Sequence, residues 1–497
     1  MRRTWLLLCL LLTLTTAWGK GVARPKLVVG IMIDQMRWDY LYYYYEQYGD
    51  DGLKRLLNEG FSCENTMITH LPTVTAIGHS SVYTGSVPAF TGIAGNNFFL
   101  NGKNVTSVTD TTCVAVGSDI THKSGKCSPR NLLANTIGDQ LKIATDFKAK
   151  VIGVALKDRA SILPAGHAAD AAYWWDDKAG HFITSNYYMD KLPSWVESFN
   201  KVNHTEPNYN IKEDPLGITY TFKLAEEALV KEQMGKDDVT DLLAISISST
   251  DAIGHATGTR GKENWAAYKE LDKCLGKFLR YLDQKVGSGN YLLFLTADHG
   301  AVHNNNFMND HKLPGGGWNY APHMKMLNEG LSKKFGVEGQ YVRAIMDCRI
   351  YLDHDLILGH GLDLDAVKQE AVSILSTDPQ FAYVADYERV NTQTMPFFLR
   401  ERIINGYNRE RSGDLAVVLQ GSHQHGRVSK DYKGTSHGTW NPDDSHIPLV
   451  FMGWNVHKGG STSTPTRMVD IAPTVCAMLH IQMPDCCIGD AIQEVWK

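Results

Sequence analysis

Three short hydrophobic runs in this chain are each followed by side chains of the kinds that bind metal ions. The runs cover 27–33, 242–247 and 291–296, and the polar residues that follow them are Asp34, Asp251, His255, Asp298 and His299. Continuous apolar runs of this length, bounded by turn residues, are typical of strands buried on both faces of a parallel sheet. Ligands of open α/β sheets bind in the crevice at the carboxyl ends of such strands. The sequence therefore predicts three carboxylates and two imidazoles around one crevice, which favours a metal site.

The spacing within each pair of candidate ligands limits whether the two side chains can bind the same metal ion. Asp251 and His255 are four residues apart, so on a helix both side chains can face one cation. Asp298 and His299 are adjacent, so they could reach one metal from two sides or contribute to two metals. Asp and His together suit Zn²⁺, with other transition metals as alternatives. A single pair could be a capped strand end with a hydrogen-bonded histidine, but three such strand ends favour the metal site.

Hydroxyl side chains lie where a loop is predicted to run into a helix. The segment 70–81 reads HLPTVTAIGHSS, and its proline and threonines place Thr73 or Thr75 near the first turn of that helix. A hydroxyl there feels the positive end of the helix dipole, and an adjacent metal would lower its pKa further. Thr75 is therefore a candidate nucleophile, although without a metal it would be an ordinary N-cap.

The elements that must hold these residues alternate between strands and helices. Further buried runs at 150–156 and 447–453 extend the series. The alternation predicts an α/β fold, a layered domain with a central, largely parallel sheet between helices. The segment 195–240 is polar and contains two prolines, so we expect a surface excursion there.

The stretch from 303 to 425 interrupts this alternation. Three strand candidates and one amphipathic helix occur there, at 349–353, 381–384, 415–419 and 364–374. We predict a small α+β cap subdomain at 303–425, inserted into a catalytic core made of 20–302 and 426–497.

The first residues carry the features of an export signal. Two arginines, an apolar run at 6–14 and small residues after it predict a signal peptide at 1–19, and so a periplasmic or secreted protein. Cys9 leaves a lipoprotein signal as a weaker alternative. Removing 1–19 takes away two arginines and no acid, so the net charge of −5 becomes about −7. A mildly acidic chain is a poor nucleic-acid binder, and without a later run of about 20 apolar residues we expect no stable membrane insertion after signal removal.

The nucleophile segment also resembles a known family. The motifs are TVTAIGH at 73–79, TGSVP at 84–88, GIAGN at 92–96, LKDRAS at 156–161 and ADHG at 297–300. They resemble the alkaline phosphatase superfamily, and the nearest match is its bacterial phosphate-irrepressible alkaline phosphatase group. That group is periplasmic and monomeric and is related to the nucleotide pyrophosphatase/phosphodiesterases. The resemblance runs nearly end to end, and it implies an alkaline-phosphatase-like fold.

The resemblance also implies two zinc ions about 4 Å apart and a covalent mechanism. The implied ligands are Asp251, His255 and His437 for one zinc, and Asp34, Asp298, His299 and the Thr75 hydroxyl for the other. Thr75 would attack phosphorus to give a phosphothreonine, which water would hydrolyse at the first zinc. Asn96 would hold one phosphoryl oxygen, and Lys157 with Arg159 would hold the others. No third, magnesium, site is expected.

For the proposed ligand His437, the sequence offers a second histidine nearby as an alternative. His437 lies in a Ser-His-Gly motif at the family's distance before the last strand, whereas His446 lies just before that strand. We prefer His437 as the ligand, which leaves His446 a structural or supporting role.

Two cations set the predicted substrate class. Lys157 and Arg159 favour a phosphate monoester, because it brings close to two negative charges and a diester only one. Each charge-assisted contact is worth about 1.5–3 kcal/mol. We therefore predict an exported, zinc-dependent phosphate-monoester hydrolase of broad specificity, a monomer that acts on small phosphorylated substrates. The alternatives are a phosphodiesterase/nucleotide pyrophosphatase of the same superfamily and a non-catalytic, metal-stabilised binding protein. A sulfatase is rejected, because Cys127 to Arg130 is one residue short of the Cys-x-Pro-x-Arg motif.

Overall fold

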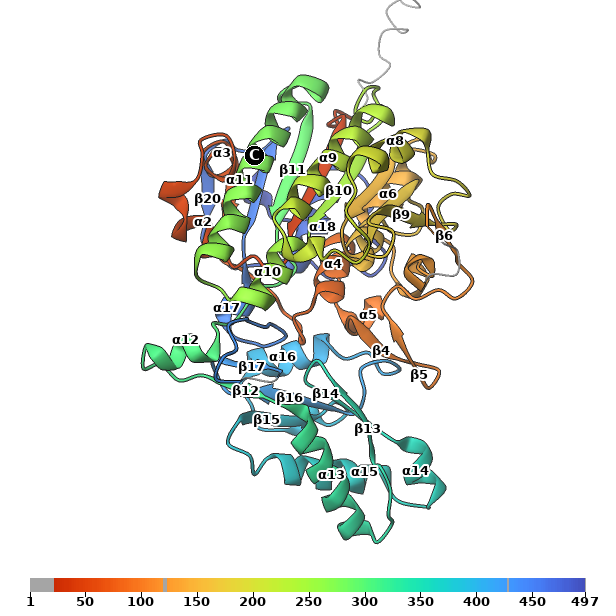
Figure 1. The fold of residues 1–497 in the computed structure, drawn as a ribbon, viewed down its shortest axis with the longest axis vertical. Coiled ribbons are helices and arrows are strands. Elements are labelled where there is room, and N and C mark those ends of the chain that lie inside the picture. The colour runs from red at the N-terminus through yellow and green to blue at the C-terminus, as the bar shows by residue number, and fades with distance from the viewer. Residues whose placement is uncertain (1–21, 119–122, 427–428, 497) are drawn as a thin grey trace, which may run out of the picture.

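The computed structural model describes residues 22–118, 123–426 and 429–496, and Figure 1 shows a larger upper part and a smaller lower part. The upper part is a layered α/β core, and the lower part is the cap. The predicted signal peptide at 1–19 lies outside the described residues. No helix that the structure describes is both long and apolar enough to cross a membrane.

The core is built on a ten-stranded sheet in which five neighbouring strands are parallel. Across the sheet the strands are β20 (Gly460–Thr462), β2 (Phe61–Cys63), β19 (Leu449–Gly453), β11 (Tyr291–Thr296), β1 (Leu27–Ile33), β10 (Asp241–Ile247), β7 (Val151–Ala155), β8 (Ala171–Asp176), β9 (His181–Ser185) and β6 (Ala115–Val116). The three predicted metal-bearing runs are β1, β10 and β11. They lie side by side in the parallel part, so the predicted fold class is confirmed.

The run predicted as one strand at 447–453 is interrupted by Pro448. Proline has no N–H to donate and breaks the ladder between β18 (His446–Ile447) and β19. β18 pairs with β3 (Thr66–Met67), while β19 runs antiparallel to β11.

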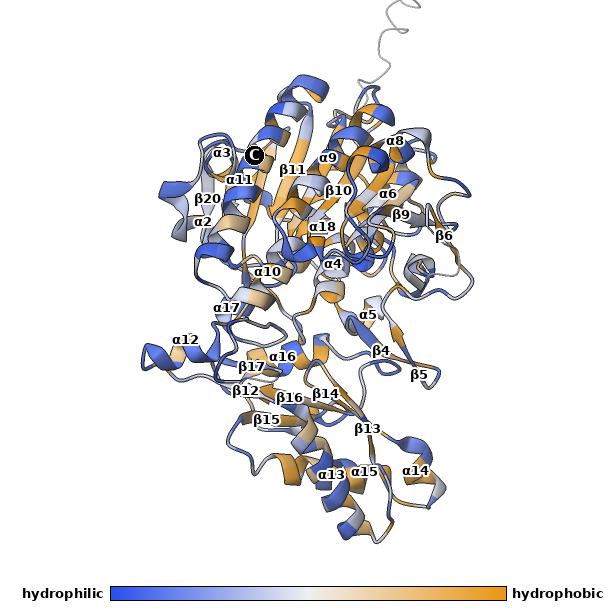
Figure 2. Ribbon diagram, viewed as in Figure 1, coloured by the Kyte–Doolittle hydropathy of each residue, from blue (hydrophilic) through white to orange (hydrophobic). Residues whose placement is uncertain are grey.

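Helices cover both faces of the core sheet (Figure 1). α9 (Leu216–Lys231) and α11 (Lys262–Leu282) pack against each other on one face. On the other face α4 (Thr75–Thr84) packs against α7 (Asp158–Ala165) and α18 (Ile471–Leu479). Figure 2 shows hydrophobic strands between helices whose outer faces are hydrophilic.

The prediction of a surface excursion at 195–240 holds only for 203–210, which form no helix or strand and are mostly exposed, and it is wrong for the helical remainder of the segment. This segment contains α8 (Ser194–Val202) and α9, and α9 packs against β10. The buried side chains of α9 include Ile218, Phe222, Ala225 and Leu229. Their spacing follows the period of a helix, a signal that the polar residues and prolines around it obscured.

The cap has its own antiparallel sheet and its own core. In order, its strands are β13 (Val342–Met346), β14 (Arg349–Leu352), β16 (Leu415–Leu419) and β15 (Phe381–Asp386). α13 (Tyr320–Phe335) and α15 (Leu364–Leu375) pack on it, and the buried apolar side chains form a cluster separate from that of the large sheet. The predicted α+β insertion is present, while its bounds at 303 and 425 stay a prediction.

Gly30, in the middle of β1, lets α4 lie close to the sheet. A Cβ atom at this position would be 2.2 Å from Tyr83 Oη and 2.6 Å from Phe294 Cζ. Tyr83 belongs to α4, so its ring occupies the space that any side chain at Gly30 would need. The same helix begins at Thr75, so this close approach also sets the position of the candidate nucleophile.

We expect Gly30→Ala to lower the free energy of unfolding by about 1–3 kcal/mol, as overpacking of a core does. A matched control is Gly359→Ala at the end of α14 (His354–Gly359), where a Cβ would meet no atom within 4 Å. That change should stay within about 0.5 kcal/mol. Denaturant unfolding of both variants checks this, and equal effects would contradict the packing argument.

Candidate metal centre

Three adjacent strands deliver three carboxylates to one place at their carboxyl ends. β1 lies between β10 and β11 with the strands in register, so the residues that follow them are neighbours. Asp34 directly follows β1, Asp251 lies in the first turn of α10 (Ser249–Thr257), and Asp298 comes shortly after β11. All three side chains are buried. Three carboxylates buried so close together repel each other unless cations balance them.

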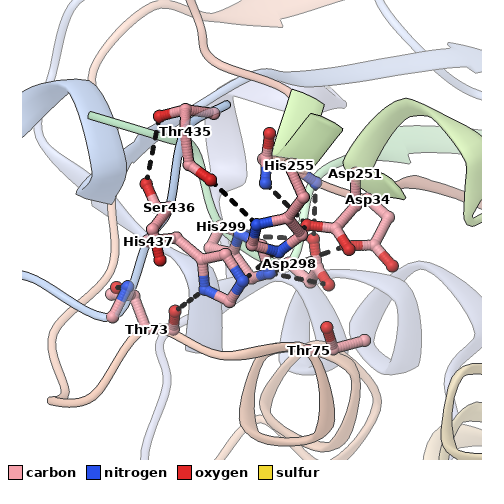
Figure 3. A network of polar contacts seen from close by, with 12 residues as sticks. Asp34, Thr73, Thr75, Asp251, His255, Asp298, His299, Thr435, Ser436 and His437 are labelled. Carbon is pink, nitrogen blue, oxygen red and sulfur yellow. Dashed lines mark hydrogen bonds and ion pairs between the residues drawn. The ribbon is translucent and has the colours of Figure 1, made fainter. Parts of the chain in front are cut away.

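Histidines complete two groups of potential metal ligands. The groups are Asp251, His255 and His437, and Asp34, Asp298 and His299, and within each the ligand atoms lie within 4.8 Å of one another. In the first group, His255 Nε2 lies 3.1 Å from Asp251 Oδ1 and His437 Nε2 lies 3.7 Å from it. The groups adjoin, because the rings of His299 and His437 stack with their centroids 3.6 Å apart (Figure 3). The structure thus brings together the Asp and His side chains of the two ligand sets that the resemblance implied.

The three histidines are oriented by backbone carbonyls. The hydrogen bonds are His255 Nδ1 to Thr435 O (2.9 Å), His299 Nδ1 to Gly300 O (2.9 Å) and His437 Nδ1 to Thr73 O (2.7 Å). A carbonyl oxygen can only accept, so each Nδ1 carries a proton, and in the neutral form of each ring the lone pair is on Nε2. That lone pair faces the site, which is the arrangement found in metal-binding histidines.

Three buried polar atoms of the second group have no hydrogen-bond partner among the described residues. They are Asp34 Oδ1, Asp298 Oδ2 and His299 Nε2. These atoms face each other, with His299 Nε2 3.6 Å from Asp34 Oδ1 and 3.5 Å from Asp298 Oδ2. Unpartnered buried polar atoms are costly, and a shared cation would satisfy all three. Carboxylate and imidazole ligands in this combination suit Zn²⁺, so the residues of the second group fit a zinc ion.

The charged groups of the site strongly shift one another. Burial, with two neighbouring carboxylates, holds the pKa of Asp34 well above its ordinary value. Burial acts in the same direction on Asp251, but His255 and Lys157 outweigh it, and the pKa of Asp251 lies well below its usual range. Burial, with a second imidazole alongside, keeps the pKa of His437 well below its usual value. His437 is therefore neutral and able to bind a metal.

Lys157, which precedes α7, lies between the two groups. Its Nζ is 2.6 Å from Asp34 Oδ2 and 2.5 Å from Asp251 Oδ2, and its side chain is 8% exposed. Burial lowers its pKa, but the two carboxylates outweigh this effect and raise it, so the ammonium is charged. Arg159 lies in the first turn of α7 with its side chain 26% exposed, close enough for its charge to oppose that of Lys157. Lys157 therefore contacts a carboxylate of each ligand group, and Arg159 interacts with Lys157 through its charge.

Thr75 is the first residue of α4, and its side chain is turned towards the acidic cluster (Figure 3). It is 1% exposed. The N-cap residue is Val74, whose backbone is extended, so the Thr75 hydroxyl is not the N-cap of this helix. Gly78 allows α4 to touch the loop after β11, since a Cβ there would lie 2.3 Å from Asp298 O. The helix is therefore packed directly against a ligand of the second group.

The hydrogen bonds of Asn96 and of Thr73 show that Thr73 and Thr75 have different roles. Asn96 Oδ1 accepts a hydrogen bond from Ala76 N at 2.9 Å, so it satisfies a free N–H in the first turn of α4. Thr73 Oγ1 donates to Thr439 O at 3.1 Å and accepts from Gly438 N at 3.0 Å. The Thr73 hydroxyl thus ties down the loop that carries the neighbouring His437. Because the Thr73 hydroxyl is engaged in two hydrogen bonds, Thr75 is the better candidate nucleophile of the two.

Gln35 and His79 contact the ligands but were not predicted. Gln35 Nε2 donates to Asp251 Oδ1 at 2.6 Å, and its backbone N donates to Asp298 Oδ1 at 3.1 Å. His79 Nδ1 donates to Thr75 O at 2.8 Å and lies 3.3 Å from Asp298 Oδ2. Two features of the sequence could have indicated these contacts: Gln35 directly follows Asp34, and His79 lies one helical turn after Thr75.

His446 lies outside both ligand groups. Its Nε2 donates to Glu64 O at 2.9 Å, and its ring stacks on Trp38 with the centroids 4.6 Å apart. The structure therefore brings His437, and not His446, into the cluster.

Comparison with known proteins identifies the family. Residues 28–440 match the family described as type I phosphodiesterase / nucleotide pyrophosphatase. The chain is 44% identical to a protein named calcium-transporting ATPase from Myroides odoratus, over 98% of this chain and 97% of that protein. It is 42% identical to alkaline phosphatase PafA from Elizabethkingia meningoseptica, over 96% of this chain and 95% of that protein.

A solved structure agrees with the sequence relatives. The crystal structure of wild-type alkaline phosphatase PafA matches with a TM-score of 0.91 at 41% identity, covering 96% of this chain and all of that chain. The matches confirm the predicted superfamily and the prediction that the chain is an enzyme. This chain thus belongs to the type I phosphodiesterase / nucleotide pyrophosphatase family, within the superfamily that its motifs resemble.

Proposed function

We propose that this chain is an exported, zinc-dependent alkaline phosphatase of broad specificity, which hydrolyses phosphate monoesters through a covalent phosphothreonine on Thr75. The observation that carries the proposal is the convergence of Thr75 with two adjoining carboxylate–imidazole groups and a buried lysine. The relative named alkaline phosphatase PafA supports the reaction class, because it is similar over nearly the whole chain. Small phosphorylated compounds are the proposed substrates.

The ligand groups are proposed to hold two zinc ions. The proposed ligands are Asp251, His255 and His437 for one ion, and Asp34, Asp298, His299 and the Thr75 hydroxyl for the other. When bound, the two ions would neutralise charge on the phosphoryl oxygens and lower the pKa of the Thr75 hydroxyl and of water. The neutral imidazole of His437 and the three unpartnered buried atoms support this assignment.

Thr75 is proposed to act in two displacements. Its Oγ bonds to phosphorus as the bond to the ester oxygen breaks, its hydroxyl proton passes to solvent, and the departing alcohol takes up a proton. The positive end of the α4 dipole favours the ionised Oγ. A water oxygen then bonds to phosphorus, the bond to Thr75 breaks, and Thr75 regains a proton as inorganic phosphate leaves.

Asn96, Lys157 and Arg159 are proposed to hold the phosphoryl oxygens. Asn96 Oδ1 is engaged by Ala76 N, which leaves the two Nδ2 hydrogens for a ligand beside Thr75. Once metal ions balance the carboxylates, the ammonium of Lys157 is best placed on a phosphoryl oxygen, with Arg159 on another. Their two positive charges favour the doubly charged monoester over the singly charged diester.

The second candidate is a phosphodiesterase or nucleotide pyrophosphatase. The description of the matching family favours it, because it names those activities. A diester would bring only one negative charge, and a second ester group, to Lys157 and Arg159. Substitution of these two residues therefore distinguishes a monoesterase from a diesterase.

We expect the purified protein, with zinc, to prefer p-nitrophenyl phosphate to bis-p-nitrophenyl phosphate. Lys157→Ala should lower kcat/KM for the monoester by about 10- to 100-fold, the value of one charge-assisted contact. It should lower kcat/KM for the diester by less than about threefold, because the diester carries only one negative charge and so loses less electrostatic attraction when Lys157 is removed.

A matched control is Lys150→Ala. Lys150 stands at the amino end of β7, away from the site, with its Nζ bonded to Glu232 O at 2.6 Å, so the monoester-to-diester ratio should not change. Bound metal is measured in each variant, because Lys157 also touches two proposed ligands. A wild type that prefers the diester, with little change in Lys157→Ala, would replace this proposal by the second candidate.

The remaining parts of the proposal concern the state of the protein. We infer export to the periplasm or to the outside of the cell, and a monomer in solution. The signal-like pattern at 1–19 supports export, and the resemblance to a monomeric, periplasmic group supports both.

A further inference from the structure

A buried arginine of the cap contacts the core beside the candidate nucleophile. Arg349, the first residue of β14, is 1% exposed. Its Nη1 donates to Ala94 O, and its Nη2 donates to Asn97 O at 3.1 Å. The two carbonyl groups belong to residues on either side of Asn96, so one guanidinium spans the segment that carries this side chain.

The chain at 94–97 passes directly over the guanidinium. A Cβ atom at Gly95 would lie 2.2 Å from Arg349 Nη2, so no side chain fits between them. Arg349 is held in turn by Asp347, whose Oδ2 lies 3.2 Å from the same Nη2. A planar, charged fork with several donors loses little freedom when it binds two carbonyls, and this makes the contact stiff.

The side chain of Asn96 is fixed from the opposite direction. Its Oδ1 is bonded to Ala76 N, the residue after Thr75, at 2.9 Å. The amide therefore has a defined orientation at the start of α4, while the backbone below it is held by the cap. If the backbone segment moved, the Nδ2 group would move relative to the Thr75 hydroxyl.

We propose that Arg349 is a positioning residue for Asn96, so that the cap holds a phosphoryl-binding amide of the core in place beside the nucleophile. The inference rests on the proposed function, because it requires Asn96 to contact a phosphoryl oxygen. It gives the inserted subdomain a direct part in the geometry of the site. A misplacement of about 1 Å can cost up to a hundredfold in rate, so loss of this contact should be measurable.

The test is a double-mutant cycle on p-nitrophenyl phosphate hydrolysis. Asn96→Ala should lower kcat/KM by about 10²- to 10³-fold, as loss of one oxyanion donor does. Arg349→Gln should lower it by about 10- to 100-fold. In the Asn96→Ala background, Arg349→Gln should have less than about a threefold further effect, because the group that it positions is already gone. Arg349→Gln combined with Arg159→Ala should instead give the product of the single effects.

A second cap arginine provides the matched control. Arg411 Nη1 donates to Gly92 O and to Asn131 O, both at 2.7 Å, so it also joins the cap to the core but does not flank Asn96. Any effect of Arg411→Gln should multiply with that of Asn96→Ala. Bound zinc and the melting temperature are recorded for every variant. If Arg349→Gln does not fold, Arg349→Lys keeps the charge, can reach only one carbonyl, and takes its place in the same cycle.

The outcomes separate the inference from the proposed function. Full multiplication of the Arg349 and Asn96 effects would overturn the positioning role and leave the phosphatase proposal standing. An Asn96→Ala variant with unchanged activity would overturn the role of Asn96, and the inference with it. The absence of a further effect in the Asn96→Ala background, with multiplication for Arg411→Gln, supports the inference.

Discussion

Replacing Thr75 by alanine is expected to lower kcat/KM for phosphate monoesters by at least about a thousandfold, the scale seen when a nucleophile is removed. Alanine lacks the oxygen that forms the proposed bond to phosphorus. The fold should survive, because the N-cap of α4 is Val74 and the Thr75 hydroxyl does not cap the helix. Both zinc ions should still bind, because the second ion loses its proposed Thr75 ligand but keeps Asp34, Asp298 and His299.

The control for this prediction is Thr75→Ser, which keeps the hydroxyl and should retain activity within about tenfold. Steady-state kinetics on p-nitrophenyl phosphate, with zinc content and melting temperature measured in parallel, give the comparison. If Thr75→Ala kept most of the activity at full metal content, another group would have to be the nucleophile.

The second large effect is expected at His437, the proposed ligand for which the sequence also offered His446 as an alternative. His437→Ala should reduce bound zinc from about two ions per chain to about one, because it removes one of three protein ligands from the first group. Activity should fall by at least about a thousandfold, since a catalytic metal supplies several kcal/mol of charge stabilisation. The orientation of His437 by Thr73 O, with Nε2 towards Asp251, is the physical basis for this expectation.

The matched variant is His446→Ala. This histidine binds Glu64 O and stacks on Trp38, so its loss should leave two zinc ions per chain and activity within about tenfold of wild type. Elemental analysis of both purified variants and their rates decide between the two histidines. Loss of zinc from His446→Ala, with His437→Ala unaffected, would reverse the assignment.

Much of the site could be predicted from the sequence because its ligands follow buried strands directly. Asp34 and Asp298 each come just after a continuous apolar run, and Asp251 and His255 lie one helical turn apart. Parallel pairing then brings the strand ends together, whatever the details of the helices. The residue types at the end of a strand are a local feature of the sequence, so one sequence is enough to identify them.

Contacts between distant segments could not be predicted in this way. His437 reaches Asp251 from far along the chain, and no local pattern distinguished it from His446 apart from the family resemblance. His79 and Gln35 have ordinary local contexts, and only the contact of α4 with Asp298 and that of Gln35 with Asp251 in α10 show that they touch the ligands. For the same reason the contact of Arg349 with the segment around Asn96 appears only in three dimensions.

The proposed two-step transfer through Thr75 is tested most directly by the stereochemical course at phosphorus. The substrate is a phenyl phosphate made chiral with the three stable isotopes of oxygen, and the product is the monoester formed when the purified, zinc-loaded protein transfers the phosphoryl group to an added alcohol. Two successive displacements, the first by Thr75 and the second by the alcohol, predict retention of configuration. Inversion would mean a single direct displacement and would contradict a phosphothreonine intermediate.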